Sequence, residues 1–410
     1  MAYNRKQRLN DNIKAIETAF ILDREQRTPT ARERLLLERY CGFGGLKCIL
    51  NPARELADAV HWAKSDLELF APTVELHRLI RENSKNESEY KQLMDSLKQS
   101  VLTAFYTPSA VTEALTDVLK EHQIIPEKVL EPSAGIGAFV DSVLDNNPKA
   151  DIMAFEKDLL TGKILRHLHP EQKVRIEGFE KIEKPFNDYF DLAISNIPFG
   201  DVAVFDPSYT AMKGMRALVT RRIHNYFFVK ALDTVRDGGL VAFITSQGVL
   251  NAKNNSAARF MMLYHADLVS AIRLPNNLFT ENANTEVGSD LIILQKNTQK
   301  ESLRGDDNLL DTVYNDENRI PTNNYFLEHP ERIIHTTAKL DTDPFGKPAM
   351  IYTHEDGVEG IAEDLRKMLH EDFKKNLNLN RYLGIEETKA EEVNPTCSLY
   401  AYNSLILKYR

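Results

Sequence analysis

Cysteine, tryptophan and long hydrophobic runs are scarce in this sequence. The chain of 410 residues holds only three cysteines, Cys41, Cys48 and Cys397, whose scattered spacing matches no metal-binding pattern and suits a reducing compartment. No run of about 18 apolar residues is present, which argues against a membrane-spanning helix. The first residues lead into a charged segment rather than an apolar signal peptide. The sequence therefore predicts a cytoplasmic protein without a membrane partner.

The clearest turn motif lacks a third glycine. The segment Val129–Val140, VLEPSAGIGAFV, is typical of a short strand, a glycine turn and a helix start. Gly135 and Gly137 allow a ligand to approach the backbone closely, but Val140 stands where a dinucleotide fingerprint has its last glycine, which argues against NAD. Glu156 follows about 20 residues later, where a carboxylate can accept hydrogen bonds from ribose hydroxyls. An ordinary solvated acid is the alternative for Glu156.

The most informative motif follows the apolar segment 190–195 and reads Asn196-Ile197-Pro198-Phe199. The Asn196 side-chain oxygen and the Ile197 carbonyl can both accept hydrogen bonds from an exocyclic amine. Two such acceptors localise the nitrogen lone pair and make the amine nucleophilic. Pro198 keeps Ile197 extended, and Phe199 offers a stacking face for a planar substrate. A plain strand-to-loop turn is the alternative.

Taken in order, these motifs resemble the S-adenosylmethionine-dependent amino-methyltransferases, most closely the N6-adenine DNA methyltransferases with the gamma order of motifs. That family has a Phe-Tyr-Thr-Pro-like element ahead of the glycine turn, and Phe105-Tyr106-Thr107-Pro108 stands there in this chain. A simple helix start is the alternative for this element. The resemblance covers about residues 100–300 of the chain.

The resemblance implies two sets of site residues. S-adenosylmethionine would be bound by Phe105, Tyr106, Thr107, Glu131, Pro132, Ala134, Gly135, Gly137, Glu156 and Phe179. The catalytic set would be Asn196, Ile197, Pro198 and Phe199. Two positions depart from the family pattern. Gly178 replaces the acid that commonly precedes the adenine-contacting Phe, and Ile197 replaces the first of two prolines, which loosens the loop.

Net charge does not favour a DNA-binding protein as a whole, because it is −9 at neutral pH. Most of the excess acid lies in residues 301–410, however. A local basic stretch directly follows the Asn196 loop, and we expect DNA to approach there through phosphate contacts; a solvated loop is the alternative. Its candidate nucleic-acid-binding residues are Lys213, Arg216, Arg221 and Arg222.

Helical and strand patterns alternate through the middle of the chain. Strands are predicted at 151–155, 174–179, 190–195, 240–245, 268–274 and 289–294. We therefore expect an α/β fold with a doubly wound, mostly parallel sheet, as in the Rossmann-like class I methyltransferases. We expect three parts: a helical N-terminal region over 1–100, a methyltransferase core over 101–300, and a small C-terminal extension of loops and helix over 301–410. Asp237-Gly238-Gly239 is expected to end a helix over 221–235.

Methyl transfer from S-adenosylmethionine to adenine N6 in DNA is the predicted function. The same chemistry on RNA adenine or a protein glutamine is the first alternative, and a non-catalytic nucleic-acid-binding module on a degenerate scaffold is the second. The segment Tyr40–Leu46 also resembles one found ahead of the methylase core in large phage and conjugative-element proteins that join an adenine methylase to a helicase. No phosphate-binding helicase loop occurs in this sequence. A separate helicase or specificity subunit is therefore a candidate partner.

Overall fold

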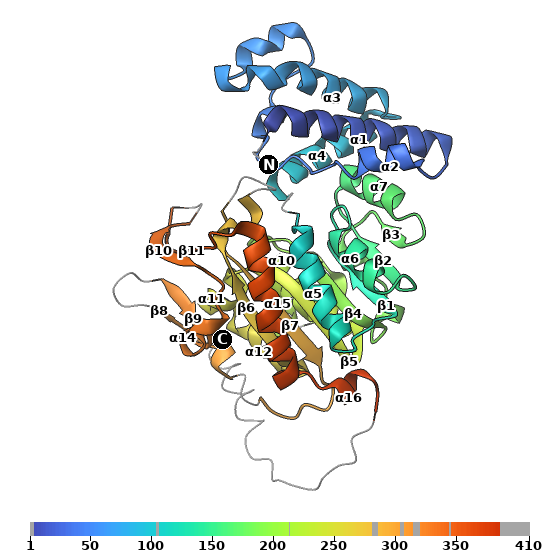
Figure 1. Cartoon of the computed structure of the whole chain (residues 1–410). Coiled ribbons are helices and arrows are strands. Elements are labelled where there is room, and N and C mark those ends of the chain that lie inside the picture. The colour runs from blue at the N-terminus through green and yellow to red at the C-terminus, as the bar shows by residue number, and fades with distance from the viewer. Residues whose placement is uncertain are drawn as a thin grey trace.

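A seven-stranded sheet forms the centre of the computed structural model, which describes residues 4–103, 106–212, 214–280, 286–303, 307–314, 320–343 and 346–385. The strand order is β3-β2-β1-β4-β5-β7-β6, and only β7 runs antiparallel to its neighbours within this sheet. The doubly wound, mostly parallel sheet predicted from the sequence is therefore confirmed (Figure 1). The strands are β1 (Lys128–Glu131), β2 (Asp151–Phe155), β3 (Lys173–Arg175), β4 (Phe190–Asn196), β5 (Val235–Ser246), β6 (Ala266–Leu274) and β7 (Ser289–Lys296).

Helices cover both faces of this sheet, which explains why its inner strands are apolar on both sides. One face packs against α5 (Ser109–Glu121), α6 (Ala138–Asn146) and α15 (Gly357–Asn376), and the other against α10 (Ile223–Thr234) and α12 (Ser256–His265). Alternate residues of β4 enter the two cores: Leu192 and Ile194 on one side, Ala193 on the other. Burial of each large apolar side chain stabilises the fold by about 1.5–3 kcal/mol.

The N-terminal region is helical, as predicted, and has its own core. It comprises α1 (Arg5–Glu25), α2 (Ala31–Leu37), α3 (Phe70–Glu82) and α4 (Glu87–Thr103), with three short 3-10 helices at Lys47–Leu50, Leu56–His61 and Lys64–Leu69. This core is completed by α7 (Leu159–Leu168), the helix that follows β2. Figure 1 shows these helices stacked on the α7 side of the sheet. The N-terminal region is therefore packed against the sheet domain through one shared helix.

Two local predictions are wrong. The strand expected over 174–179 ends at Arg175, and Phe179 begins a short 3-10 helix instead. The helix α10 ends at Thr234, and Gly238 and Gly239 lie inside β5 instead of capping the helix. The pairing of β4 with β5 shifts register at this point, between Phe190 and Leu192. Gly238 has φ +73°, and a Cβ there would lie 2.2 Å from the Arg381 carbonyl oxygen. The two glycines thus permit a kinked start of the strand, which a sequence pattern does not distinguish from a helix end.

The C-terminal part adds small elements and one long helix. Two hairpins are formed by β8 (Thr312–Tyr314) with β9 (Pro321–Asn323) and by β10 (Thr337–Thr342) with β11 (Pro348–Thr353). The long helix α15 packs on α5 and β6 within the main core. The proposed three-part division stays a prediction. The remaining short helices are α8 (Pro207–Thr210), α9 (Met215–Val219), α11 (Gly248–Asn251), α14 (Asn324–Glu328) and α16 (Leu379–Tyr382).

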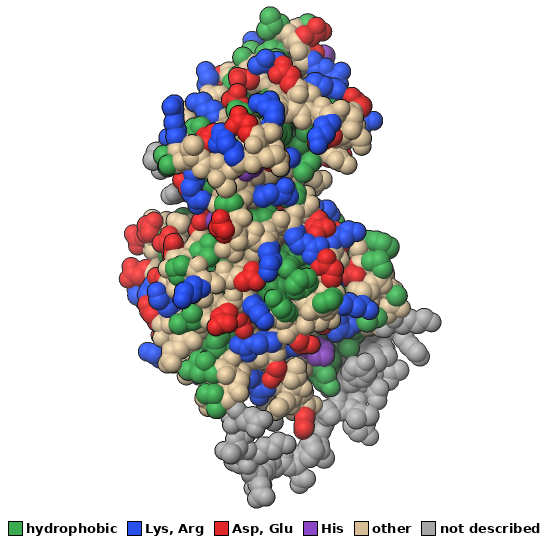
Figure 2. Space-filling model, turned by 90° about the vertical axis from the view of Figure 1, so that its right-hand side faces the viewer, with side chains coloured by type: hydrophobic (Ala, Val, Ile, Leu, Met, Phe, Trp, Pro, Cys, Tyr) green, Lys and Arg blue, Asp and Glu red, His purple; other side chains and the backbone are tan. Residues whose placement is uncertain are grey.

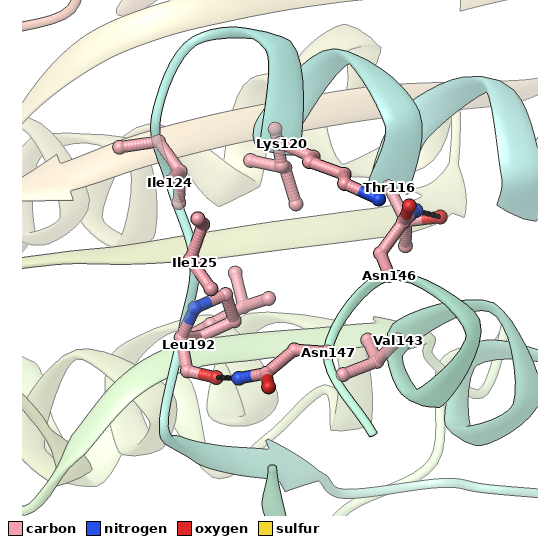
Figure 3. Close-up of a pocket in the computed structure, with 10 residues that line it drawn as sticks. Thr116, Lys120, Ile124, Ile125, Val143, Asn146, Asn147 and Leu192 are labelled. Carbon is pink, nitrogen blue, oxygen red and sulfur yellow. Dashed lines mark hydrogen bonds between the residues drawn. The ribbon is translucent and has the colours of Figure 1, made fainter. Parts of the chain in front are cut away.

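The surface is mixed in charge. Lys and Arg side chains are interspersed with Asp and Glu side chains over the face drawn in Figure 2. A pocket between α5, α6 and the segment before β1 is lined by Ile124, Ile125 and Asn147, and the Asn147 side-chain amide donates a hydrogen bond to the Pro126 carbonyl (Figure 3). It lies near the amino end of β1, so it is not at the edge where ligands bind in such sheets. Within the described ranges, no helix is long and apolar enough to cross a membrane.

Candidate active site

Three polar side chains end neighbouring parallel strands. Glu131 is the last residue of β1, Glu156 directly follows β2, and Asn196 is the last residue of β4. The strands β2, β1 and β4 are adjacent and parallel, and adjacent strands lie about 4.8 Å apart. The sheet therefore brings these three residues to one edge, as the sequence predicts. This is the edge at which open α/β sheets bind ligands.

The turn after β1 depends on its glycines. Gly135 and Gly137 have φ of +56° and +96°, in the left-handed region that favours glycine. A Cβ on Gly135 would lie 2.8 Å from the Tyr106 ring, and a Cβ on Gly137 would lie 2.5 Å from His169 Nε2. The Ala134 amide donates to the Phe155 carbonyl at 2.9 Å, which attaches the turn to the end of β2. The turn thus has a fixed shape, and the missing side chains of its two glycines make room for the Tyr106 ring and for His169.

Glu131 is a buried acid with unused hydrogen-bonding capacity. Its side chain is 1% exposed, and neither carboxylate oxygen makes a hydrogen bond of good geometry in the described part of the chain, although the Ser195 hydroxyl and the Ser133 backbone lie close enough to lower its pKa slightly. Burial raises the pKa of Glu131 to about 8. Leaving such a group unpaired is costly, so an unpartnered acid inside a protein is expected to meet a ligand. A cationic group of a bound cofactor would satisfy it.

Glu156 supports the glycine turn. One carboxylate oxygen accepts from the Gly135 amide at 2.9 Å and the other from the Asp158 amide at 2.7 Å. Burial, with a further contribution from the neighbouring Asp158 carboxylate, raises the pKa of Glu156 to about 8. A carboxylate offers about four acceptor positions. Glu156 can therefore hold the turn and still accept hydrogen bonds from a ligand.

Side chains of the N-terminal region connect to this supporting layer. Asp158 caps α7 by accepting from the Thr161 amide at 2.7 Å, and its second oxygen accepts from the Ser96 hydroxyl of α4, also at 2.7 Å. Ser96 in turn accepts from the Leu160 amide at 3.0 Å. A continuous set of hydrogen bonds therefore runs from α4 through Asp158 and Glu156 to Gly135.

Two tyrosines meet the same helix. The hydroxyls of Tyr40 and Tyr106 lie 3.2 Å and 3.5 Å from the Thr161 hydroxyl. Tyr40 belongs to the Tyr40–Leu46 segment and is 1% exposed. The glycine-rich segment singled out in the sequence therefore packs behind the sheet edge that carries Glu131 and Glu156, which we call the cofactor edge. Thr107 is buried as well, whereas Phe105 lies outside the described residues.

The Asn196 loop begins as an extension of the sheet. The Ile197 amide donates to the Ile244 carbonyl of β5 at 3.0 Å, and the Ile197 side chain is 1% exposed. Proline commonly stands at this position in N6-adenine methyltransferases. Ile197 adds a backbone hydrogen bond that proline could not make and a side chain that packs in the core. The half-buried Phe199 ring meets Phe279 edge to face, with centroids 6.2 Å apart. Asn196, Pro198 and Phe199 remain partly accessible at the sheet edge.

Phe179 lies deeper than the other candidate residues. Its ring is 1% exposed and packs among Phe155, Tyr226 and Phe227. These contacts are those of a core residue, and a role beside the cofactor adenine stays a prediction. Pro132 and Ala134 are buried within the glycine turn.

The predicted basic stretch is divided among different partners. Arg216 forms a two-pronged ion pair with Asp233 at 2.6 and 2.9 Å. Arg222 lies 3.2 Å from Asp201 and donates to Asn254 and Asn255. Arg221 is exposed, and Lys213 lies outside the described residues. Of the described candidates, Arg221 is therefore the one most open to a phosphate.

Comparison with known proteins decides the family. Residues 88–391 match the family model described as N-6 DNA Methylase. The chain belongs to the N-6 DNA methylase family. The predicted resemblance is thus confirmed, and membership implies methyl transfer with S-adenosylmethionine as donor.

Two curated relatives and one solved structure are similar to this N-6 DNA methylase. Defense against restriction protein B of Escherichia phage P1 is 29% identical over 201 residues, which are 48% of this chain and 8% of that protein. Type II methyltransferase M.XamI of Xanthomonas campestris pv. amaranthicola is 25% identical over 173 residues, 39% of this chain and 33% of that protein. A type I restriction-modification methyltransferase subunit from Streptococcus thermophilus is 13% identical with a TM-score of 0.40, covering 91% of this chain and 94% of that one. The chain thus spans a third or less of the length of either curated relative.

Several supporting residues of the site were not singled out from the sequence. These are Ser96, Asp158 and Thr161, together with Phe279 behind Phe199. Asp158 had a signal, because an Asp directly before a helical segment is a favoured N-cap. Ser96 had none, since it is 62 residues from Asp158 and meets it only in the folded chain.

Proposed function

We propose that this N-6 DNA methylase transfers a methyl group from S-adenosylmethionine to the N6 amine of adenine in DNA. The observation that carries the proposal is the shared sheet edge of Glu131, the Gly135 turn, Glu156 and Asn196. A donor site and an amine-accepting carboxamide on adjacent strands allow the two reactants to be held together. Such positioning can supply a large part of a rate enhancement.

The cofactor half of the edge fits S-adenosylmethionine chemically. The unpaired Glu131 carboxylate suits the cofactor's ammonium group, and Glu156 suits its ribose hydroxyls. Gly135 and Gly137 hold the left-handed turn that brings backbone amides to this edge of the sheet. When bound, S-adenosylmethionine supplies a methyl group on a positively charged sulfur, which a nucleophilic nitrogen can attack.

The Asn196 loop prepares the nucleophile. The Asn196 carboxamide oxygen and the Ile197 carbonyl accept the two hydrogens of the adenine amine, which directs its lone pair away from the ring. The hydrogen bond from the Ile197 amide to Ile244 keeps this peptide in place. Phe199 stacks on the adenine ring, and its contact with Phe279 limits its motion. No general base is required, because the nitrogen proton becomes acidic once the methyl group is attached and leaves to water.

Methyl transfer from radiolabelled S-adenosylmethionine tests this proposal. Duplex DNA, single-stranded DNA, RNA and a protein extract are each incubated with the chain, and the modified product is digested and identified. We expect label in DNA as N6-methyladenine. Label in RNA or protein alone would contradict the DNA substrate, and cofactor binding without any transfer would favour the degenerate-scaffold alternative.

A further inference from the structure

The segment directly after the Asn196 loop exposes large apolar side chains. Phe205 is 77% exposed and Val202 is 61% exposed. Both follow Phe199 within six residues, so they emerge beside the loop proposed to hold the target base. A single exposed apolar residue needs no explanation, but an exposed aromatic ring next to a binding edge does.

Phe205 is held in place although its ring is free. The next residue, Asp206, is 3% exposed, and its carboxylate accepts from the Tyr226 hydroxyl at 2.7 Å and from Lys230 Nζ at 3.3 Å. Its other oxygen accepts from the Ser208 amide and hydroxyl at 2.8 and 2.6 Å. On the preceding side, the Val204 amide donates to the Thr220 carbonyl at 2.8 Å. The backbone on both sides of Phe205 is therefore fixed, which lowers the entropic cost of presenting the ring to a partner.

The charge beside Phe205 indicates the kind of partner. Thr220, bonded to Val204, is followed directly by the exposed Arg221. The next residue, Arg222, is held by Asp201, Asn254 and Asn255. An exposed aromatic ring with an exposed arginine on the neighbouring segment suits stacked bases between phosphates more than an apolar protein surface.

We propose that Phe205 is a wedge that enters duplex DNA and fills the space vacated by the extruded base. This rests on the proposed function, since a base must leave the duplex to reach Asn196. Inserted apolar side chains are a general means of unstacking a base step. Arg221 would contact the adjacent phosphate, and Val202 would lie against the neighbouring base.

The first test compares duplex DNA with the same DNA after strand separation. For Phe205→Ala we expect methylation of duplex DNA to fall roughly tenfold, the scale of one lost base–aromatic contact, and methylation of single strands to change less than twofold. Phe205→Trp should restore duplex activity. Ile125→Ala is the matched control, because Ile125 is 53% exposed and lies by the pocket near the amino end of β1. Equal losses on both DNA forms, or no loss on duplex, would overturn the wedge.

A second test does not depend on methyl transfer. The chain contains one tryptophan, Trp62, which is 7% exposed, so Phe205→Trp adds a distinct fluorophore. We expect a pool of random duplex oligonucleotides to quench this added emission, with no such change in the wild-type chain. Quenching without methylation of any DNA would retain the wedge and reject the proposed function. Unchanged emission at saturating duplex, or self-association of the wild-type chain that Phe205→Ala abolishes, would overturn the wedge.

Discussion

The cofactor edge and the segment after the Asn196 loop are built in opposite ways. At the cofactor edge, Glu156, Asp158 and Ser96 form a connected set of hydrogen bonds, and the acids are largely removed from water. In the segment after the loop, the backbone is anchored at Asp206 but Val202 and Phe205 project into solvent. A small ligand of constant shape can be bound by polar groups that are fixed in advance. A large duplex can be contacted only by side chains that are exposed on the surface. The buried polar edge therefore suits a small ligand, and the exposed apolar segment suits a macromolecule.

Loss of the Asn196 carboxamide should have the largest effect, because it should reduce turnover while leaving cofactor binding intact. For Asn196→Ala we expect turnover to fall by roughly 10²–10³-fold, the scale of one lost hydrogen-bonding group at a reacting centre. Affinity for S-adenosylmethionine should change less than threefold, because Glu131, Glu156 and the glycine turn are untouched. Single-turnover methylation and calorimetry measure the two quantities. Asn187→Ala, an exposed residue before β4, is the control, and normal turnover of Asn196→Ala would refute the catalytic role.

A methyl group on the glycine turn should weaken cofactor binding beyond any loss of stability. In Gly135→Ala the new Cβ meets the Tyr106 ring and the residue keeps a positive φ, so we expect S-adenosylmethionine affinity to fall more than tenfold. Gly346→Ala is the matched control, since Gly346 has φ +80° with nothing within 4 Å of its Cβ position. The control should lose only about 1–2 kcal/mol of stability. Equal cofactor affinity in the two variants would show that the shape of the turn at Gly135 does not matter for cofactor binding.

The raised pKa values of the two acids predict a pH dependence. Glu131 and Glu156 have pKa values of about 8 without ligand, so below pH 8 each binds a proton. The ammonium group assigned to Glu131 expels the proton of that acid, whereas the neutral ribose hydroxyls assigned to Glu156 do not. Affinity for S-adenosylmethionine should therefore rise with pH up to about 8 and then level off. The rise should be about tenfold per pH unit for each proton released. Calorimetry in two buffers of different ionisation enthalpy counts the protons released when the ligand binds, and Glu131→Gln should abolish the proton release that comes from Glu131. A flat affinity between pH 6 and 8 would contradict the assignment.

Removal of the Ser96 hydroxyl should have the smallest effect on cofactor affinity. It tests whether the hydrogen bond from α4 to Asp158 supports the cofactor site. Ser96→Ala leaves one oxygen of Asp158 with one fewer donor, and a lost hydrogen bond of about 0.5–1.5 kcal/mol corresponds to a few-fold weaker cofactor binding. Ser96→Thr should recover it. Ser84→Ala removes a hydroxyl that bonds only within its own region, to the Ile80 carbonyl, and serves as the control. An equal effect in both variants would indicate general destabilisation.

The sequence predicts the local parts of the site better than its connections. The strand 151–155 and the strand ends at Glu131 and Asn196 follow from short patterns of apolar residues, glycine and proline, and the structure has them at those positions. Gly238 misled the prediction because a glycine serves both a helix end and a strand kink. Arg216 was grouped with other basic residues, but its charge is taken up by Asp233, which only folding brings near. Side-chain pairs between residues far apart in the sequence are therefore the part of the site that sequence patterns did not predict.

The dual membership of α7 has a consequence for where this protein can be cut. Leu160, Ile164 and Leu168 on this helix complete the core of the N-terminal helices. A chain shortened to begin at residue 88, where the match to the methylase family starts, would keep α4 but lose α1, α2 and α3, and would leave part of that aliphatic surface of α7 facing water. The region that matches the methylase family therefore begins later in the sequence than the region needed to complete the hydrophobic core around α7.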